Sequence, residues 1–387
     1  MTACIVGWSH SKFGKLEGTL EDLIVQVAQG AIADAGIEPS DVDQIYIGTF
    51  NGGLDEQDFA ASLVLQADDR LRFTPSTRVE NACATGSAAI YQGINAIDAG
   101  KARIVLAVGV EKMTAIDTSA VGKILLRASY RKNEHFTDGG FAACFDVIQS
   151  SYFQRYGDQS DATARIAAKN HKNGSVNPLA HMQRDFGYEF CRNVSEKNPI
   201  VVGQLKRTDC SMVSDGAAAV VLTDTQTALS MKKAIAFRAA QHVQDFLPMA
   251  KRDVIAFEGP ELAWKKALAE ARLTLDDLSF VESHDCFTIA ELIEYEAMGL
   301  TPKGQGARAI HEGWTEKDGK LPVNPSGGLK SKGHPIGATG VSMHVMAAMQ
   351  LDGSAGGMQV RDPRIGAVFN MGGVAVANYV SILEKLR

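Results

Sequence analysis

The chain alternates short apolar segments with amphipathic ones, in the order expected of strands and the helices that cover them. Apolar runs predict strands at 5–8, 44–48, 77–80, 103–109, 216–222, 279–283, 365–369 and 378–383. The stripe of Leu23, Val27 and Ala31 predicts a helix over 20–35, which Gly36 ends. Further helices are expected over 83–99 and 288–298. Strand, helix and strand in alternation predict an α/β fold built in layers.

The second half of the chain repeats the first. Val27 and Asp41 match Ala263 and Asp277, at the same offset along the sequence. Ala-Thr-Gly at 84–86 is echoed by Ala-Thr-Gly at 338–340, and a buried strand follows each motif. A run of matches with a fixed offset indicates a duplicated fold. Corresponding helix starts should then meet near a pseudo-two-fold axis, which is a natural place for an active site.

The segment 115–206 interrupts this pattern. It is rich in polar, aromatic and glycine residues, and its only helix candidate lies around 162–170. We expect a large excursion from the first sheet that builds a substrate-binding lid. The predicted organisation is therefore an N-terminal half (1–114 and 207–232), the loop excursion (115–206) and a C-terminal half (233–387).

Composition and charge exclude several classes of protein. Hydrophobic residues make up 45% of the chain, which is enough to bury a large core. A mainly disordered protein is therefore excluded. A net charge of −6 argues against binding nucleic acid or an anionic membrane surface. There is no apolar run of membrane-spanning length and no secretory signal at the start. The six cysteines form no CxxC pair, which favours reduced thiols in the cytoplasm and no zinc site.

Two loops that correspond in the repeat carry the first candidate residues. Cys83 lies between a strand and a helix, where the helix dipole and free N–H groups favour a thiolate and could hold an oxyanion. His334 lies in a glycine-rich loop, where Pro335 restricts it to an extended conformation. Tight helix–sheet packing at Cys83 and a structural histidine at 334 are the alternatives.

Two further segments end buried strands. The motif His-Asp-Cys-Phe at 284–287 places His284 and Cys286 at a strand-to-helix junction, where ligands usually bind in such folds. Asp285 is expected to cap the following helix, and Glu291 and Glu294 on that helix are expected to be solvated. The segment Phe-Asn-Met-Gly-Gly at 369–373 could bring a backbone N–H to a carbonyl oxygen, or merely turn the chain.

These motifs together resemble the thiolase superfamily over essentially the whole chain. Asn-Ala-Cys-Ala-Thr-Gly-Ser at 81–87, Gly-His-Pro at 333–335 and the duplicated halves carry the resemblance, which implies a layered α/β/α/β/α core. The motif at 284–287, with 169–171, 177–178 and 193–199, is similar to the sterol-carrier-protein type of thiolase and its bacterial and archaeal relatives. Better-known thiolases have a catalytic cysteine in a C-terminal Cys-x-Gly motif, and this chain has Asn-Met-Gly at 370–372. The resemblance therefore implies that Cys286 supplies the acid/base thiol.

The implied activity is an acyl transfer that makes or cleaves 3-oxoacyl-CoA. His334 would accept the proton of Cys83, whose thiolate would form an acyl-enzyme. The N–H groups of Cys83 and Gly372 would form one oxyanion site, and His284 with His334 would hold the enolate of acetyl-CoA. Cys286 would move the proton at the α-carbon, with coenzyme A thioesters as substrates and no metal or further cofactor.

Alternatives of other classes fit less well. A decarboxylating condensing enzyme would leave Cys286 without a task, and a retro-aldolase would not need the nucleophile. A non-catalytic acyl-CoA-binding scaffold would give no reason for two thiols and two histidines in matched loops. The resemblance also implies a homodimer or homotetramer and allows for a small OB-fold partner protein.

Overall fold

The computed structural model describes residues 3–135 and 139–387, so that three positions of the predicted excursion, 136–138, and the first two residues of the chain lie outside the described residues. Nine strands form one mixed sheet in the order β3-β2-β4-β7-β1-β8-β11-β10-β9. Their bounds are β1 Ala3–His10, β2 Gln44–Gly48, β3 Ser76–Val79, β4 Ile104–Glu111, β7 Gly216–Asp224, β8 Ile235–Gln244, β9 Phe280–Glu282, β10 Ile365–Gly372 and β11 Ala377–Lys385. A separate hairpin joins β5 (Ile200–Val202) to β6 (Leu205–Lys206).

The strand pairings confirm the duplication. In the first half β2 is parallel to β4, β4 is antiparallel to β7, and β7 is antiparallel to β1. In the second half β9, β10, β11 and β8 repeat this pattern in the same order. The halves join where β1 pairs briefly with β8. Even the single 3-10 turns before β2 and β9, Pro39–Asp41 and Leu275–Asp277, follow the sequence offset.

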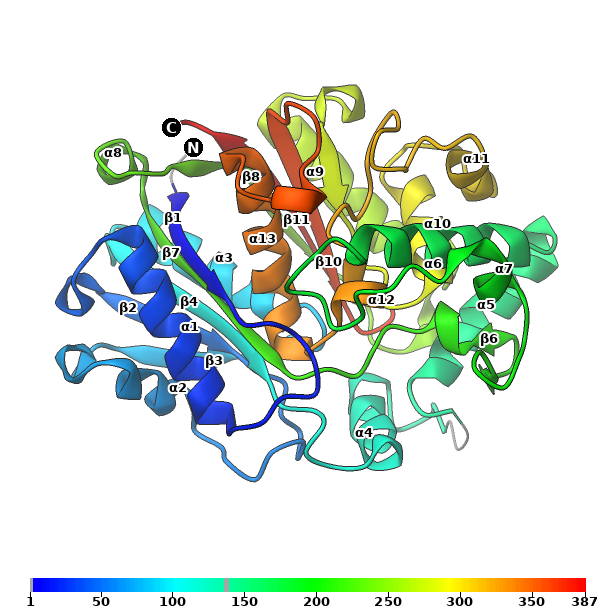
Figure 1. Cartoon of the computed structure of the whole chain (residues 1–387), viewed down its shortest axis with the longest axis horizontal. Helices are drawn as coiled ribbons and strands as arrows, with labels where there is room; N and C mark the ends of the chain where they lie inside the picture. Colours follow the sequence, from blue (N-terminus) through cyan, green and yellow to red (C-terminus); the bar gives the residue numbers. More distant parts are fainter. Residues whose placement is uncertain (1–2, 136–138) are drawn as a thin grey trace.

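Helices cover the two halves of the sheet and separate them. Those of the two halves are α1 Leu20–Ala35, α2 Ala60–Leu63, α3 Thr85–Asp98, α8 Thr225–Ala228, α9 Glu258–Ala271, α10 Thr288–Ala297, α11 Gly306–His311, α12 Gly328–Lys332 and α13 Ile336–Asp352. The outer helices are α1 on the first half and α9 on the second, and α3 with α13 lie between the halves (Figure 1). This gives the expected α/β/α/β/α layering.

The two central helices approach closely because both begin with small residues. A Cβ added at Gly340 of α13 would lie 2.1 Å from the backbone nitrogen of Ser87, and one added at Gly86 of α3 would lie 2.7 Å from that of Val341. The repeated Ala-Thr-Gly motifs therefore meet face to face across the pseudo-two-fold axis, as the sequence predicts. The N-terminal ends of both helices are thereby held at one point of the molecule.

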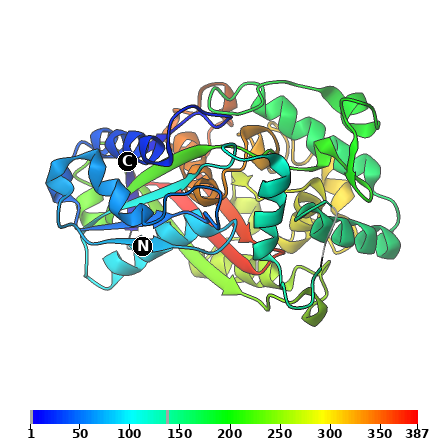
Figure 2. The same ribbon diagram turned by 90° about the horizontal axis from the view of Figure 1, so that it is seen from below.

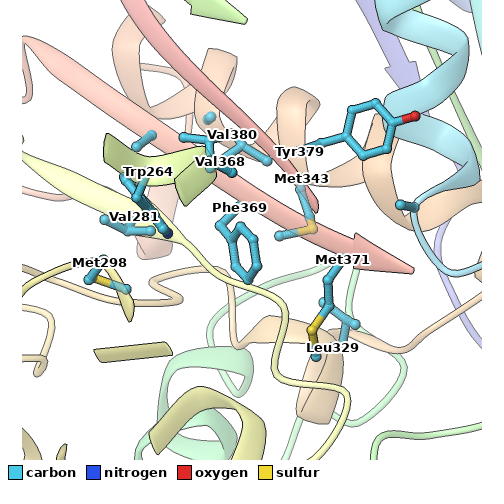
Figure 3. Packing of buried hydrophobic residues seen from close by; sticks show 14 of the residues in the cluster. Trp264, Val281, Met298, Leu329, Met343, Val368, Phe369, Met371, Tyr379 and Val380 are labelled. Atoms are coloured by element: carbon cyan, nitrogen blue, oxygen red, sulfur yellow. The ribbon is translucent and has the colours of Figure 1, made fainter. Parts of the chain in front are cut away.

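The largest apolar cluster packs around the second half of the sheet. Figure 3 shows part of it, where Phe369 and Met371 of β10 lie among side chains from α9, α13 and β11, including Trp264, Met343 and Val380. A second cluster fills the space between α1 and the first half of the sheet. Both β4 and β10, whose ends lead to the predicted site, are thus held in place by packed apolar side chains.

The excursion is more helical than the sequence indicates. It contains α4 Thr118–Leu125, α5 Ala142–Tyr156, α6 Ser160–Gly174 and α7 Gly187–Arg192, which gather on one side of the molecule (Figures 1 and 2). The sequence predicts only a part of α6. The buried stripe of α5 (Phe145, Ile148, Tyr152) has helical spacing, but polar residues interrupt it and mask the pattern. Within the described part of the chain, every helix is too short or too polar to cross a membrane.

Candidate active site

The four side chains singled out in the sequence converge. Cys83 precedes α3, His284 and Cys286 follow β9, and His334 lies in the loop between α12 and α13. One ligand atom each of Cys83, His284 and His334 lie within 4.8 Å of one another. The two imidazole rings stand nearly perpendicular, with centroids 5.2 Å apart. Cys286 and Cys83 line the same cavity, and the nearby Cys83 sulfur contributes to the raised pKa of Cys286.

The backbone at Cys83 is sharply turned. Ala82 has a φ of 50°, in the left-handed region that few residues with a side chain adopt. Hydrogen bonds hold this turn, because the backbone N–H of Asn81 donates to Oγ1 of Thr85 at 2.8 Å and the Thr85 N–H donates to the Ala82 carbonyl at 3.1 Å. The turn presents the Cys83 side chain at the start of α3. Local strain of this kind concentrates at functional sites.

The glycines after β10 lie against this turn. A Cβ on Gly372 would lie 2.2 Å from the Asn81 carbonyl oxygen, so only glycine fits there. The backbone N–H of Gly373 lies close enough to the Cys83 thiol to lower its pKa. The backbone N–H that lies near the Cys83 sulfur thus belongs to Gly373, one residue after Gly372, which the sequence indicates. The oxyanion role of Gly372 remains a prediction.

Burial keeps both Cys83 and His334 neutral. It raises the pKa of Cys83 to about 12, against the opposing effect of the Gly373 N–H. Burial and the nearby Lys332 lower the pKa of His334 to about 3. The position of Cys83 at a helix N-terminus predicts a thiolate, but desolvation of the charge outweighs that effect in the free protein. In the free protein the proton therefore stays on Cys83 and is not transferred to His334.

His334 is oriented as a proton acceptor. The hydroxyl of Thr339 donates to the Pro335 carbonyl oxygen at 2.9 Å, so its oxygen accepts from Nδ1 of His334 at 2.7 Å. Nδ1 therefore carries the proton, and Nε2 is left with its lone pair. The backbone N–H of His334 is also fixed, by a 3.1 Å bond to the Met212 carbonyl.

Asp285 connects two of the catalytic loops. Its carboxylate accepts from the backbone N–H groups of Leu329 and Lys330, at 2.6 and 3.1 Å. It therefore caps the short helix α12, and not α10, which follows it in the sequence. The sequence assigns Asp285 the right kind of role at the wrong helix, because a carboxylate can cap any helix that the fold brings to it.

The prediction that Glu291 and Glu294 are solvated is wrong, since both are 0% exposed. Glu291 forms a buried ion pair of 2.9 Å with Lys169 of α6, and Glu294 accepts from the Ser283 hydroxyl at 2.5 Å. The lid packs over this face of α10, so a helix that looks amphipathic is enclosed on all sides. Burial, with smaller effects of Cys83 and Glu294, raises the pKa of Cys286 well above its usual value.

Two adjoining cavities open from the site. The first has a volume of about 670 Å³, contains the Cys83, Cys286 and His334 surfaces, and is lined mainly by apolar residues of the lid such as Val121, Leu125 and Phe141. The second, of about 460 Å³, shares its 210–213 wall and is lined by aromatic and basic residues. These include Phe186, Phe190, Arg184, Lys197 and Arg207. An apolar chamber beside a basic, aromatic one suits a ligand with an apolar end and an anionic aromatic end.

The group of Cys83, His284 and His334 has ligand types that suit a soft metal ion. However, the side-chain amide N–H of Asn370 donates to Nδ1 of His284 at 2.9 Å, so Nε2 of His284 bears a proton. A metal at Nε2 would have to displace that proton and reverse the Asn370 amide. The residues present therefore fit a metal poorly.

Sequence reasoning missed three polar residues of the site. They are Thr339 behind His334, Asn370 behind His284, and Lys332, a fully buried lysine whose ammonium donates to Ser342 Oγ at 2.6 Å. Lys332 and Thr339 flank the Gly-His-Pro motif, so their closeness in sequence was a usable signal. Asn370 is far from His284 in the sequence, and no local pattern points to its partner.

Comparisons with known proteins agree with this geometry. Residues 3–186 match the model of the thiolase N-terminal domain, and residues 240–385 match that of the thiolase C-terminal domain-like family. The chain is 36% identical to an acetyl-CoA acetyltransferase of Methanothermobacter thermautotrophicus, over 98% of this chain and 99% of that one. It is 32% identical to human sterol carrier protein 2, over 95% of this chain and 69% of that one.

Solved structures share the fold. A structure named Ltp2-ChsH2(DUF35) aldolase superposes with a TM-score of 0.85 at 22% identity, covering 100% of this chain and 98% of the other. An acetyl-CoA acetyltransferase from Syntrophomonas wolfei superposes with a TM-score of 0.72 at 18% identity, covering 99% of each chain.

Proposed function

Because the chain belongs to the thiolase superfamily, we propose that it is an acyl-CoA C-acyltransferase that makes or cleaves 3-oxoacyl-CoA through an acyl-enzyme on Cys83. The observation that carries this proposal is that Cys83, Cys286 and His334 line one cavity, with His284 beside Cys83 and His334 and in the opposite tautomer to His334. Relatives named acetyl-CoA acetyltransferase, which align over almost the full chain, support the same class of reaction.

In the cleavage direction His334 takes the proton of Cys83, using the lone pair at Nε2. The thiolate adds to the 3-oxo carbon, and the C2–C3 bond then breaks to leave an acyl-enzyme and the enolate of acetyl-CoA. The enolate oxygen is held by the Nε2–H of His284 and by the protonated His334. Cys286 delivers its proton to the enolate carbon and is left as a thiolate.

The second half of the reaction restores the site. The Cys286 thiolate takes the thiol proton of coenzyme A, whose sulfur attacks the acyl-enzyme. The tetrahedral intermediate is stabilised by backbone N–H groups at Cys83 and the Gly372–Gly373 turn. Cys83 leaves and recovers its proton from His334. Synthesis is the same sequence in reverse.

The two cavities fit the two parts of such a substrate. We assign the apolar cavity to the acyl group and the end of the pantetheine arm, because it contains Cys83. The basic cavity suits the phosphates and the adenine ring of coenzyme A, through charges such as Arg184 and Arg207 and the face of Phe186. Their common wall at 210–213 gives one ligand access to both.

The proposal includes association with other chains. We infer a homodimer or homotetramer, in keeping with the superfamily. The name of the aldolase with the same fold combines Ltp2 with ChsH2(DUF35), which supports including a small OB-fold partner in the proposal.

The proposed function is tested by mixing the purified protein with acetoacetyl-CoA and free coenzyme A and following loss of the 3-oxo thioester. Wild type should turn over, and Cys83→Ala and Cys286→Ala should each lower kcat by at least about a thousandfold. Cys4→Ala is the matched control, since Cys4 is a buried thiol of β1 outside the site, and it should retain activity.

Other outcomes would redirect the proposal. Turnover without Cys83 would contradict the acyl-enzyme, and turnover without Cys286 would require another acid/base. Silent wild-type protein that still becomes acylated at Cys83 would be an acyltransferase with another acceptor or a missing partner. Silence without acylation would favour a binding or scaffold protein.

A further inference from the structure

Asn370 occupies the centre of the site without a role in the reaction described above. It lies in β10, is 0% exposed, and each polar atom of its side chain has a partner. Its Oδ1 accepts from the Ser87 hydroxyl of α3 at 2.7 Å. Its Nδ2 donates to the Cys83 carbonyl oxygen at 3.2 Å and to Nδ1 of His284 at 2.9 Å. One amide thus joins β10 to two other segments of the site, the start of α3 and the loop after β9.

These bonds fix which way the amide faces. The Cys83 carbonyl can only accept, so the Asn370 atom facing it must be the NH₂ group. The Ser87 hydroxyl on the other side donates to Oδ1. A reversed amide would place oxygen against oxygen at Cys83, a repulsion that no solvent relieves at a fully buried position.

The orientation of the amide in turn fixes the tautomer of His284. An NH₂ group cannot accept, so Nδ1 of His284 offers its lone pair and the ring proton sits on Nε2. Nε2 is buried and has no hydrogen-bond partner among the described residues. A buried donor without a partner, beside Cys83 and His334, is a group held ready for a ligand oxygen.

We propose that Asn370 is a positioning residue that holds His284 as a neutral Nε2–H donor and thereby assigns it to the enolate oxygen of acetyl-CoA. The inference rests on the proposed function. Through Thr339, His334 is held in the opposite tautomer, so the two histidines of the site are made donor and acceptor by their partners.

The surroundings of His284 keep the ring uncharged. Burial is the main cause that lowers the pKa of His284 well below its usual value, and the neighbouring His334 and Lys332 lower it further. The thiol of Cys83 also faces the ring. On the side of α10, the carboxyl group of Glu294 lies near the His284 backbone N–H. Since the ring is neutral, the position of its single proton depends on Asn370 alone.

The substitution Asn370→Asp keeps the shape of the side chain but replaces the NH₂ donor that faces His284 with an oxygen that accepts. The new carboxylate would accept a hydrogen bond from Nδ1–H, so the neutral ring would carry its single proton on Nδ1 and present a lone pair at Nε2. Acyl transfer from acetyl-CoA to Cys83 uses His334 and backbone N–H groups, whereas enolate formation needs the His284 donor. The variant should therefore separate the two steps.

Two rates are measured on each protein: acetylation of Cys83 by acetyl-CoA, from intact mass, and exchange of the C2 hydrogens of acetyl-CoA in D₂O. In Asn370→Asp at pH 8 we expect acetylation close to wild type and exchange reduced about a hundredfold. Exchange should recover as the pH falls, because a neighbouring carboxylate raises the pKa of His284 and the imidazolium carries protons on both nitrogens. Wild type should show no such recovery.

Two further variants control the experiment. Ser87→Ala removes the bond that holds Oδ1 and should lower exchange in the same direction, but less. Asn173→Asp makes the same change at a buried asparagine of α6, whose amide donates to a backbone carbonyl, and should leave the ratio of the two rates unchanged. Loss of both rates in parallel in Asn370→Asp, or of neither, would overturn the proposal.

The tautomer itself gives a readout that does not depend on activity. In protein labelled with ¹⁵N-histidine, the His284 signals, assigned with His284→Gln, should show the proton on Nε2 in wild type and on Nδ1 in Asn370→Asp. A proton on Nδ1 in wild type would overturn the inference even if the enzyme were active. Wild type with the expected tautomer but with neither acetylation nor exchange would overturn the assigned role together with the proposed function.

Discussion

At the scale of single residues, the site depends on groups whose protonation is set by burial. Cys83 and His334 are ordinary titratable groups that the fold removes from water, and their pKa values move apart as a result, to about 12 and about 3. The free protein therefore holds a neutral thiol beside a neutral imidazole.

We expect the reactivity of Cys83 toward iodoacetamide to follow this state. Only the thiolate is nucleophilic, and a pKa raised to about 12 keeps the thiolate a small fraction at neutral pH. The alkylation rate should rise about tenfold per pH unit from pH 7 to pH 10, without a plateau.

Mass mapping of the alkylated peptides measures this rate at Cys83 separately from the other five cysteines. Cys83→Ala provides the blank. A rate that is already constant below pH 8 would show a thiolate–imidazolium pair in the free protein and would contradict the neutral site.

At the scale of elements, the lid is joined to the catalytic core by buried charges. Lys169 of α6 contacts Glu291 of α10 at 2.9 Å and donates to the Val323 carbonyl at 2.7 Å, and both charged side chains are 0% exposed. Asn170 of the same helix donates to Asp285 and to Glu291. The lid helix α6 is thus hydrogen-bonded, through Asp285, to the loop that carries Cys286.

Removing one partner of this buried pair should be costly. Glu291→Gln would leave the Lys169 ammonium without its countercharge, and we expect a loss of about 3 to 5 kcal/mol in the free energy of unfolding. Urea denaturation measures the effect.

The matched control lies on the same helix. Arg165 and Asp161 form an exposed pair of 2.8 Å on α6, so Arg165→Ala should cost less than about 1 kcal/mol. Similar costs for the two variants would contradict a structural role for the buried pair.

At the scale of the whole molecule, the duplication explains most of what the sequence predicts correctly. Repeated motifs fixed the order of strands and helices, and the small residues at 84–86 and 338–340 indicated that two helix starts meet. Cys83 and His334 follow from their places in these repeats, whereas His284 and Cys286 are indicated by their place after a buried strand and by the resemblance of their motif.

The features that the sequence does not predict are those created by contacts between distant segments of the chain. Glu291 and Glu294 look like the solvated face of a helix, and only the packing of α6 over α10 buries them. The partnership of Asn370 with His284 likewise depends on two strands being brought together, since the residues lie on separate segments. Local sequence patterns predict helices and strands, whereas contacts between distant segments decide the burial of charged side chains and the tautomer of a histidine.

The central claim is that Cys83 carries the acyl group, and intact-mass analysis after brief mixing with acetyl-CoA tests it most directly. We expect one added acetyl group, mapped to the Cys83 peptide, absent in Cys83→Ala and released when free coenzyme A is added. An acetyl group on another residue, or turnover of 3-oxoacyl-CoA by protein that never carries one, would contradict the account.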